Sequence, residues 1–391
     1  MTRYLSAPRS PGEPHVTDQQ QDARRLPSWA RAVLVVALLY LFLVGVKMLE
    51  GGIKGLGAEY TDAVFAAVSS PIAGLLAGIL ATVLVQSSSV STSTIVGLVA
   101  SGVVSVETAI PMIMGANIGT TVTNTLVALT HVRRSAEFSR SFAAATMHDF
   151  FNFFAVAVFL PLELATGFLS RSATALAELL GGSASGGTFD SPIKAAVKWG
   201  AGLVEEVPAL ITDHPVAFPI LVAITGIGLI FVALSSITRN MRLLVVERIE
   251  RSLNEALARS GVVGMVVGAL VTISVQSSSI TTSILIPLCA AGVLALRNAY
   301  PITLGANVGT TITALIAAVG AGSVDALTIA ITHTLFNLAG ILLIYPIPRF
   351  RYLPVRAAEA LTSVAQERKW LAFAYVVGAF FGLPVLGIIL F

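Results

Sequence analysis

The chain alternates between long apolar stretches and short polar connections. Eight windows contain no Asp, Glu, Lys or Arg, and most exceed the length of about 20 residues that lets a helix cross the hydrocarbon core of a bilayer. These windows are 32–46, 63–106, 108–132, 150–162, 214–238, 260–296, 298–324 and 370–391. Apolar runs of this length are typical of transmembrane helices. The pattern therefore predicts an all-α polytopic membrane protein.

Composition supports the same class. Of the 391 residues, 55% are hydrophobic and only 12% are charged, whereas soluble domains have about 25% charged residues. The formal net charge of +3 arises from arginines in the connections. No basic run with interleaved aromatic residues is present, so the chain is not expected to bind nucleic acid. The single cysteine, Cys289, excludes an internal disulfide.

The sequence contains an internal repeat. The run Val-Gln-Ser-Ser-Ser at 85–89 recurs at 275–279, an offset of 190 residues. At the same offset the run Gly-Ala-Asn-Ile-Gly-Thr-Thr at 115–121 recurs at 305–311, with Val in place of Ile. A second set of matches follows at an offset of 185 residues and pairs His148, Phe151, Asn152 and Pro161 with His333, Phe336, Asn337 and Pro346. A match of this extent predicts two halves with one structural plan.

The arginine-rich connections orient the chain, because Lys and Arg accumulate on the cytoplasmic side of a membrane. Arginines precede the first apolar window, at positions 24, 25 and 31, and recur in 131–140, 239–259 and 349–369. We therefore expect the N-terminus and these three connections to be cytoplasmic. The segment 170–213 is rich in Gly and Ser around its middle and more acidic than basic, and we expect it outside.

These connections fix the side of the membrane on which each apolar stretch begins and ends, and two stretches must return to the side from which they start. Each of these two is predicted to be a hairpin. The stretch 62–106 must begin and end outside, whereas 260–296 must begin and end inside. Equivalent hairpins that enter from opposite faces predict two inverted-topology repeats, an arrangement that many secondary transporters use for alternating access to a midplane site. Crossing numbers alone leave open whether each hairpin is re-entrant or a pair of full spans. The four polar residues near each turn favour a tip that lines a cavity.

These inferences give a domain organisation for a multi-pass protein of the cell membrane. The expected parts are a disordered cytoplasmic tail at 1–27, repeat 1 at 28–169 with its hairpin at 62–106, an extracellular loop at 170–213, repeat 2 at 214–346 with its hairpin at 260–296, and a cytoplasmic linker with one extra C-terminal transmembrane helix at 347–391.

The Gln-Ser-Ser-Ser runs are the strongest candidates for a binding site. Each lies between an apolar segment and a new helical run, so its serines are expected to be N-caps and the amides that follow are free donors for an anion. The side-chain oxygens could equally bind a hard cation such as sodium. Alternatively, Ser and Thr only join helices by hydrogen bonds, but matched clusters in both halves make this less favoured. The residues are Gln86, Ser87, Ser88, Ser89, Gln276, Ser277, Ser278 and Ser279.

The two Gly-Ala-Asn runs combine small residues, which permit a helix break or close helix packing, with Asn and Thr side chains that can supply oxygens. We expect discontinuous or tightly packed helical segments beside the hairpin tips. The alternative is a packing face of small residues alone. The oxygen-bearing residues are Asn117, Thr120, Thr121, Asn307, Thr310 and Thr311.

The absence of basic residues near these motifs suggests cation coupling. No Lys or Arg occurs at 62–132 or at 260–296, and helix N-termini supply only partial positive charge. A divalent oxyanion bound there would therefore need co-bound cations.

Asp149 lies about ten residues into the span 139–169, and a carboxylate inside a membrane is costly enough to indicate function. Sodium or proton binding would explain it. A structural pairing with Arg140 or His148 is the alternative. For His148 and its equivalent His333, packing or hydrogen bonding is favoured over metal ligation.

With these motifs the sequence resembles the type II sodium-phosphate cotransporter family over roughly residues 30–390. The resemblance implies that both Gln-Ser-Ser-Ser runs form phosphate- and sodium-binding hairpin tips in an elevator-like or rocking cycle, with Thr310 and Thr311 near a sodium ion. It also implies that Asp149 corresponds to the aspartate of electrogenic members, which carry an extra sodium. The chain departs from animal members in lacking the cysteines of their external loop and in ending at Phe391 after one extra span.

This interpretation predicts a sodium-coupled symporter of inorganic phosphate, not an enzyme, with no cofactor and sodium ions as co-transported ligands. A homodimer is one candidate assembly. The expected phosphate ligands are Gln86, Ser87, Ser88, Ser89, Gln276, Ser277, Ser278, Ser279, Asn117 and Asn307, and the expected sodium ligands are Asp149, Gln276, Ser277, Thr120, Thr121, Thr310 and Thr311.

Three other functions are less consistent with the sequence. A sodium- or proton-coupled transporter could carry another oxyanion or a dicarboxylate, although carboxylate recognition usually involves an arginine, which both hairpins lack. An intramembrane serine hydrolase using Ser87 or Ser277 with His148 is remote, because no Gly-x-Ser-x-Gly elbow is present. A regulatory accessory subunit that transports nothing is a third alternative.

Overall fold

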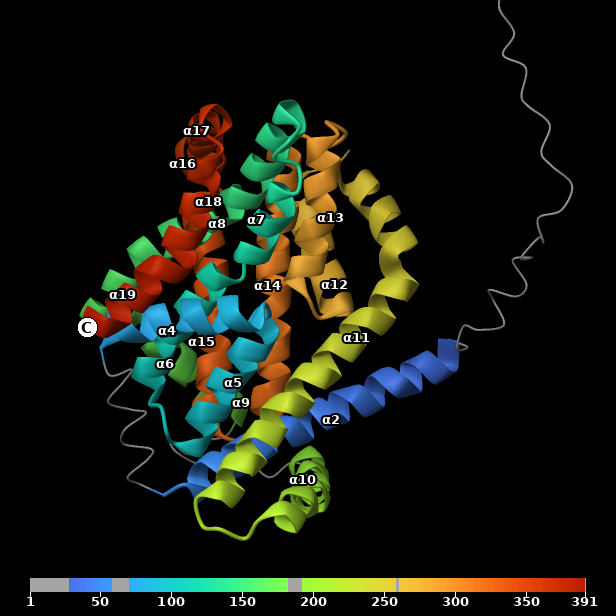
Figure 1. Ribbon diagram of the computed structural model, residues 1–391, viewed down its shortest axis with the longest axis vertical. Helices are drawn as coiled ribbons and strands as arrows, with labels where there is room; N and C mark the ends of the chain where they lie inside the picture. Colours follow the sequence, from blue (N-terminus) through green and yellow to red (C-terminus); the bar gives the residue numbers. More distant parts are fainter. Residues whose placement is uncertain (1–27, 58–69, 182–191, 258–259, 391) are drawn as a thin grey trace, which may run out of the picture.

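A computed structural model describes residues 28–57, 70–181, 192–257 and 260–390, so the expected tail at 1–27 lies outside the described residues. The described chain is almost entirely helical (Figure 1). Seven helical stretches within it are long and apolar enough to cross a membrane. They are Val33–Gly55, Val106–Leu129, Ser135–Thr166, Ala217–Ile237, Leu296–Ala321, Val324–Ile344 and Trp370–Leu390. The prediction of an all-α polytopic membrane protein is confirmed.

The helices follow one another with short connections. In chain order they are α2 (Ser28–Gly55), α4 (Pro71–Val85), α5 (Ser88–Ser101), α6 (Val106–Gly119), α7 (Val122–Leu129), α8 (Ser135–Thr166), α9 (Phe168–Gly181), α10 (Pro192–Ile211), α11 (Ala217–Leu257), α12 (Gly261–Val275), α13 (Ser278–Ala290), α14 (Leu296–Ala321), α15 (Val324–Ile344), α16 (Pro348–Arg351), α17 (Leu353–Glu367), α18 (Trp370–Val377), the π-helix η1 (Gly378–Gly382) and α19 (Leu383–Leu390).

Two helix pairs, α4 with α5 and α12 with α13, contain the Gln-Ser-Ser-Ser runs. Their four helices have 13 to 15 residues, fewer than the about 20 residues that a full crossing requires. From its turn near mid-height, α5 runs toward the end of the molecule where α10 lies, whereas α13 runs toward the end where α16 and α17 lie (Figure 1). The equivalent helices of the two pairs therefore extend in opposite directions.

Close contact between backbones fixes each helix pair against its neighbour. A Cβ atom at Gly115 of α6 would overlap the carbonyl oxygen of Leu75 in α4, and one at Gly305 of α14 would overlap that of Met265 in α12. Stripes of small residues let helices in a membrane approach in this way. The central helix α14 also packs against α5 and α15, so elements of both sequence repeats meet at the core.

The Gly-Ala-Asn segments fold differently in the two halves. In the first half, the regular hydrogen bonding of α6 ends at Gly119 and that of α7 begins at Val122. In the second half, α14 continues without a break from Leu296 to Ala321. The two segments differ only locally, because Thr120 and Thr121 keep right-handed helical dihedrals and the chain runs on as one helical stretch from Val106 to Leu129. The expectation of tightly packed segments fits both halves, since Gly115 and Gly305 each lie against the backbone of a neighbouring helix.

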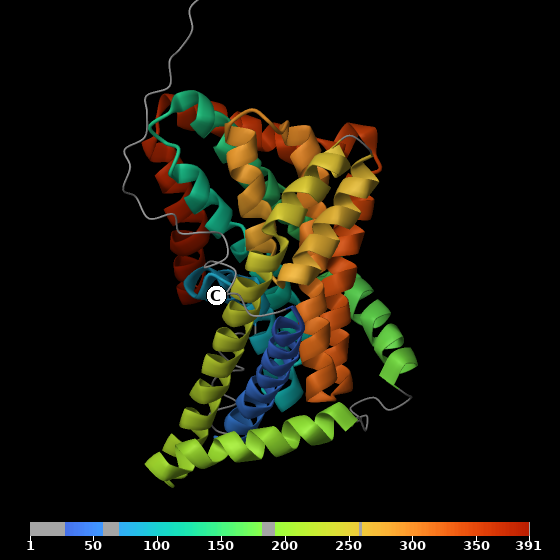
Figure 2. The same ribbon diagram turned by 90° about the vertical axis from the view of Figure 1, so that its right-hand side faces the viewer.

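Two expected connections contain helices. The segment 170–213 was expected to be a loop, but most of α9 and all of α10 lie within it. Both helices alternate apolar and polar residues with a helical period, which an emphasis on Gly and Ser composition overlooked. Figure 2 shows α10 lying crosswise beneath the other helices. The arginine-rich connection at 239–259 is likewise helical as far as Leu257, since α11 extends through it.

The last helical stretch lies against the first helix pair. Leu76 of α4 lies close to Gly387 of α19, and both η1 and α19 pack on α4. This stretch lies outside the sequence repeat, so its position has no counterpart on the second helix pair. It reaches the interior through Tyr375 of α18, described below.

Candidate functional site

The two Gln-Ser-Ser-Ser turns meet in the middle of the molecule. The Ser89 hydroxyl donates a hydrogen bond of 3.3 Å to the main-chain oxygen of Gln276, 187 residues away. Both turns lie near mid-height between the ends of the bundle (Figure 1). The structure therefore brings together the two motifs that the sequence duplicates.

Both turns have the same unusual backbone. Gln86 and Gln276 have φ angles of 55° and 54°, and no other non-glycine residue in the described chain has a positive φ. Each ends one helix in the left-handed conformation, and the serine that follows caps the next helix. Such a conformation costs energy in a non-glycine residue, and strained positions often occur at functional sites.

The glutamine side chains hold the turns by matched hydrogen bonds. The Nε2 amide of Gln86 donates to Val83 O at 2.5 Å, and its Oε1 accepts from the Thr123 hydroxyl at 3.1 Å. In the second half, Gln276 donates to Ile273 O at 2.7 Å and accepts from the Thr313 hydroxyl at 2.8 Å. Sequence reasoning missed both threonines, although they occur at the 190-residue offset. They tie each turn to the helical segment that directly follows a Gly-Ala-Asn-(Ile/Val)-Gly-Thr-Thr run.

The serines cap their helices as the sequence predicts. The Ser87 hydroxyl accepts from Val90 N, and the Ser277 hydroxyl from Ile280 N, both at 3.4 Å. The capping prediction is confirmed at these two positions. The first amides of a helix have no intrahelical partner, so α5 and α13 each direct main-chain donors toward the turns. The Ser278 hydroxyl is buried and has no hydrogen-bond partner among the described residues.

The asparagines join the two halves through a buried network. His148 Nε2 lies 2.9 Å from Asn307 Oδ1, and His333 Nε2 lies 3.4 Å from Asn117 Oδ1. Each histidine thus contacts the asparagine of the opposite repeat. Asn152 completes the link, because its Nδ2 donates to Asn117 O and its Oδ1 accepts from Asn307 Nδ2, both at 2.8 Å. The hydrogen-bonding role expected for the histidines is confirmed, and Asn117 and Asn307 are committed to this network here.

This network yields a prediction. Asn307→Ala should lower the free energy of unfolding by about 1–3 kcal/mol, because the partner atoms of His148 and Asn152 become buried without hydrogen bonds. Asn298→Ala, on the same helix but exposed, should change it by less than about 0.5 kcal/mol. Denaturant unfolding in detergent measures both variants, and equal effects would refute the structural role of the network.

The threonines of the Gly-Ala-Asn runs keep oxygen lone pairs available. The hydroxyls of Thr120, Thr121, Thr310 and Thr311 each donate to a carbonyl of their own helix, at 2.8 to 3.1 Å. A hydroxyl that donates in this way can still coordinate a cation through its lone pairs. All four residues are buried.

Asp149 is fully buried, and its partner is a residue that sequence reasoning missed. The hydroxyl of Tyr375 in α18 donates to Asp149 Oδ2 at 2.7 Å, and the side chains of Thr121 and Thr125 lie close to the carboxylate. The alternative pairing with Arg140 is not observed, because that guanidinium donates to Ala290 O. Among the described residues no basic side chain forms an ion pair with Asp149. In the sequence, the only indication of a role for Tyr375 is its position in an apolar span. A tyrosine hydroxyl that is buried there needs a hydrogen-bond partner.

A further contact crosses between the halves without a repeat counterpart. Asn124 Oδ1 accepts from the hydroxyls of Thr282 and Ser283 in α13, at 2.9 Å and 3.3 Å. The residue 190 positions later is Ala314, so the second half cannot form the equivalent bond. Ser93, the counterpart of Ser283, has a buried hydroxyl without a partner among the described residues.

Comparison with known proteins is consistent with this geometry. A family model described as Na+/Pi-cotransporter matches residues 41–181 and 229–347. The chain is 35% identical to "Sodium-dependent phosphate transport protein 2A" of Ovis aries and of Mus musculus, and each alignment covers 90% of this chain and 66% of the relative. It is 32% identical to "Sodium-dependent phosphate transport protein 2B" of Homo sapiens, with 91% of this chain and 64% of the relative covered. The chain thus spans slightly less than two thirds of these relatives. No solved structure matches it.

Proposed function

Because the chain belongs to the Na+/Pi-cotransporter family, we propose that it is a secondary active transporter that carries inorganic phosphate across a membrane together with sodium ions. The observation that carries the proposal is the contact of two equivalent Gln-Ser-Ser-Ser turns at the middle of the molecule. The relatives named above are sodium-dependent phosphate transport proteins by name. The chain is a transporter rather than an enzyme in this proposal.

The two halves form inverted repeats in this proposal, and the helix pairs α4–α5 and α12–α13 are hairpins that enter from opposite faces. Three observations support this arrangement. The helices of both pairs are too short for a full crossing, α5 and α13 run toward opposite ends (Figure 1), and each histidine contacts the asparagine of the other half. Inverted repeats of this kind allow a site near the midplane to open alternately to each side.

Phosphate binds between the two turns in this proposal. Main-chain amides at the start of α5 and α13 supply donors for its oxygens, together with the hydroxyls of the serine runs. Neither helix pair contains Lys or Arg, so the anion receives only the partial charge of two helix N-termini. Sodium ions near the turns would supply the remaining positive charge, which makes anion binding depend on the cation.

Sodium binds to oxygens around these turns and at Asp149. The threonine hydroxyls of both Gly-Ala-Asn runs, with Gln276 and Ser277, offer the oxygen ligands that a hard cation prefers. Asp149 adds a full negative charge without a basic partner among the described residues. With that extra cation the transport cycle moves net charge, so the symporter is electrogenic. The location in the cell membrane, the cytoplasmic N-terminus and the homodimer stay predictions from the sequence.

Uptake of radiolabelled phosphate by proteoliposomes tests this function. An inward sodium gradient should drive uptake into vesicles that contain the full chain, whereas an equal potassium gradient should not. Gln276→Ala should reduce the initial rate at least tenfold, because it removes the Thr313 bond and an oxygen ligand at the turn. Gln366→Ala, an exposed glutamine on α17, should leave the rate unchanged.

Two outcomes would refute the proposal. Uptake no greater than that of empty liposomes, with insertion verified, would exclude phosphate as the cargo, and sulfate, arsenate and dicarboxylates would then be assayed on the same vesicles. Equal uptake in sodium and potassium would exclude sodium coupling. A loss of rate in both glutamine variants would mean that the effect does not report on the turn.

A further inference from the structure

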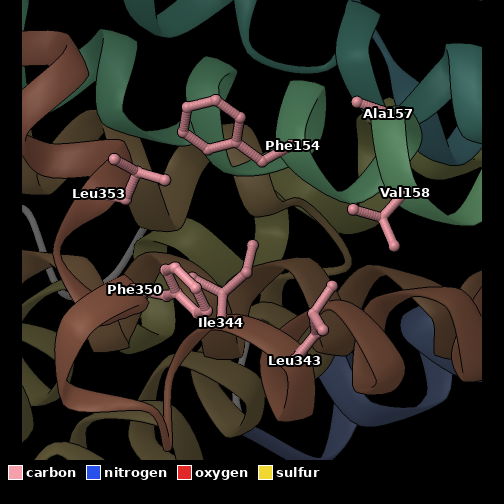
Figure 3. A pocket seen from close by; sticks show the side chains of 7 residues that line it. All are labelled: Phe154, Ala157, Val158, Leu343, Ile344, Phe350 and Leu353. Carbon is pink, nitrogen blue, oxygen red and sulfur yellow. The ribbon is translucent and has the colours of Figure 1, made fainter.

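An apolar groove opens on the outer surface of the helices, and none of its lining residues belongs to the Gln-Ser-Ser-Ser turns. It has a volume of about 260 Å³, and side chains from α8, α15, α16 and α17 line it. Figure 3 shows Phe154 and Val158 on one side, facing Leu343, Ile344 and Phe350 on the other. All of the lining residues are apolar. Contact between water and such a groove is unfavourable, so the groove is suited to hydrocarbon.

The groove lies where a membrane-spanning helix ends. Ile344 is the last residue of α15, which is one of the apolar spans. Val158, Phe350 and Leu353 are 45%, 46% and 40% exposed in the isolated chain. These side chains therefore form a surface that continues from the lipid-facing side of the bundle to the edge of the membrane.

Four arginines gather around the same end of the groove. Arg349 lies next to Phe350 in α16, and Arg356 lies one helical turn beyond Leu353 in α17. Arg351 and Arg297 lie over the rings of Tyr345 and Tyr352, 4.9 Å and 5.1 Å from the ring centres. Among the described residues none of the four forms an ion pair with a carboxylate. The patch therefore has an excess of positive charge.

We propose that this groove and its arginines bind an anionic phospholipid, with an acyl chain in the groove and the head group beside the arginines. The apolar lining favours an acyl chain. The arginines at its rim have no carboxylate partner among the described residues, so they favour a head group whose phosphate carries a net negative charge. Arginine forms paired, charge-assisted hydrogen bonds with phosphate, and basic patches at the edge of a membrane attract anionic lipids. A soluble peptide would not reach the lipid-facing part of the groove. The proposal is independent of the transported substrate.

Native mass spectrometry of the purified full chain tests the proposal. The protein is titrated with phosphatidylglycerol or with phosphatidylcholine of the same acyl chains. Phosphatidylglycerol should bind with the lower Kd, and Arg349→Gln combined with Arg356→Gln should raise that Kd about tenfold or more. The matched control combines Arg133→Gln, in the connection before α8, with Arg368→Gln, at the end of α17 opposite to Leu353. Both arginines are exposed, and the control should leave the Kd unchanged.

A second pair of variants tests the groove itself. Ala157→Trp should fill it and weaken the binding of both lipids, and Phe350→Ser should do the same by removing apolar contact. Both positions are exposed, so the fold should tolerate the changes. Equal affinities for the two lipids, or an unchanged Kd in the arginine variant, would overturn the proposal. Lipid binding that neither groove variant weakens would also overturn it. The same spectra report the oligomeric state, and variants that change only this state and not the Kd for lipid would overturn the proposal as well.

Discussion

Gly305→Ala should leave little folded protein. A Cβ atom at this position of α14 would overlap the main-chain oxygen of Met265 in α12, and one at Gly268 of α12 would overlap that of Ile302 in α14. Both obstacles belong to the backbone, so no side-chain rotation relieves them and the two helices must separate. Overpacking usually costs about 1–3 kcal/mol and occasionally more. We expect a loss of at least about 3 kcal/mol, and a similar loss for Gly115→Ala, its counterpart in the first half.

Thermal unfolding in detergent, together with the yield of monodisperse protein, measures this effect. Gly228→Ala is the matched control, because it replaces a glycine of α11 around which a Cβ atom meets nothing within 4 Å. Alanine is about 0.5–1 kcal/mol more favourable than glycine in a helix, so the control should unfold at the same or a higher temperature. If Gly305→Ala unfolds within a few degrees of the control, the inference that α12 and α14 are in backbone contact at this position is wrong.

Asp149→Asn should remove the dependence of phosphate uptake on membrane potential. The substitution keeps the size of the side chain and its bond with Tyr375 but deletes the buried charge to which a cation is attracted. Without that charge, we expect one sodium fewer in each cycle and a net transfer of charge that falls accordingly. In proteoliposomes with a potassium diffusion potential, the original chain should take up phosphate faster when the interior is negative. The variant should be at least tenfold slower and insensitive to the potential.

Tyr375→Phe is the matched comparison for this experiment. It removes the hydrogen bond to Asp149 Oδ2 and keeps the carboxylate, so uptake should stay sensitive to potential while its sodium dependence shifts. Unchanged potential sensitivity in Asp149→Asn would contradict the electrogenic role of this residue. If both variants lose their sensitivity to membrane potential, the geometry of the Asp149–Tyr375 pair, rather than the charge of Asp149, determines how sodium is coupled to phosphate.

The candidate site was partly readable from the chain. The positions of Ser87 and Ser277 as N-caps follow from a local rule, because a serine after an apolar run satisfies the first amides of the next helix. Tyr375 and Asn124 were not predictable, since each contacts a residue at least 158 positions away. The two Gly-Ala-Asn runs are nearly identical in sequence, yet the regular helical hydrogen bonding has a gap at Thr120 and Thr121 only in the first. Because the local sequences are so similar, this difference depends on the surrounding helices.

By itself, the sequence determined the class of the protein and its internal duplication, and it predicted the residues of the candidate site. These properties follow from apolar run length, from matched motifs and from the cost of a charge in hydrocarbon, which are local or additive quantities. Only the tertiary structure decided that Ser89 meets Gln276, that each histidine contacts the asparagine of the other half, and that the final helix brings Tyr375 to Asp149. Such contacts depend on how helices distant in the chain pack against one another, and apolar stripes constrain that packing only loosely.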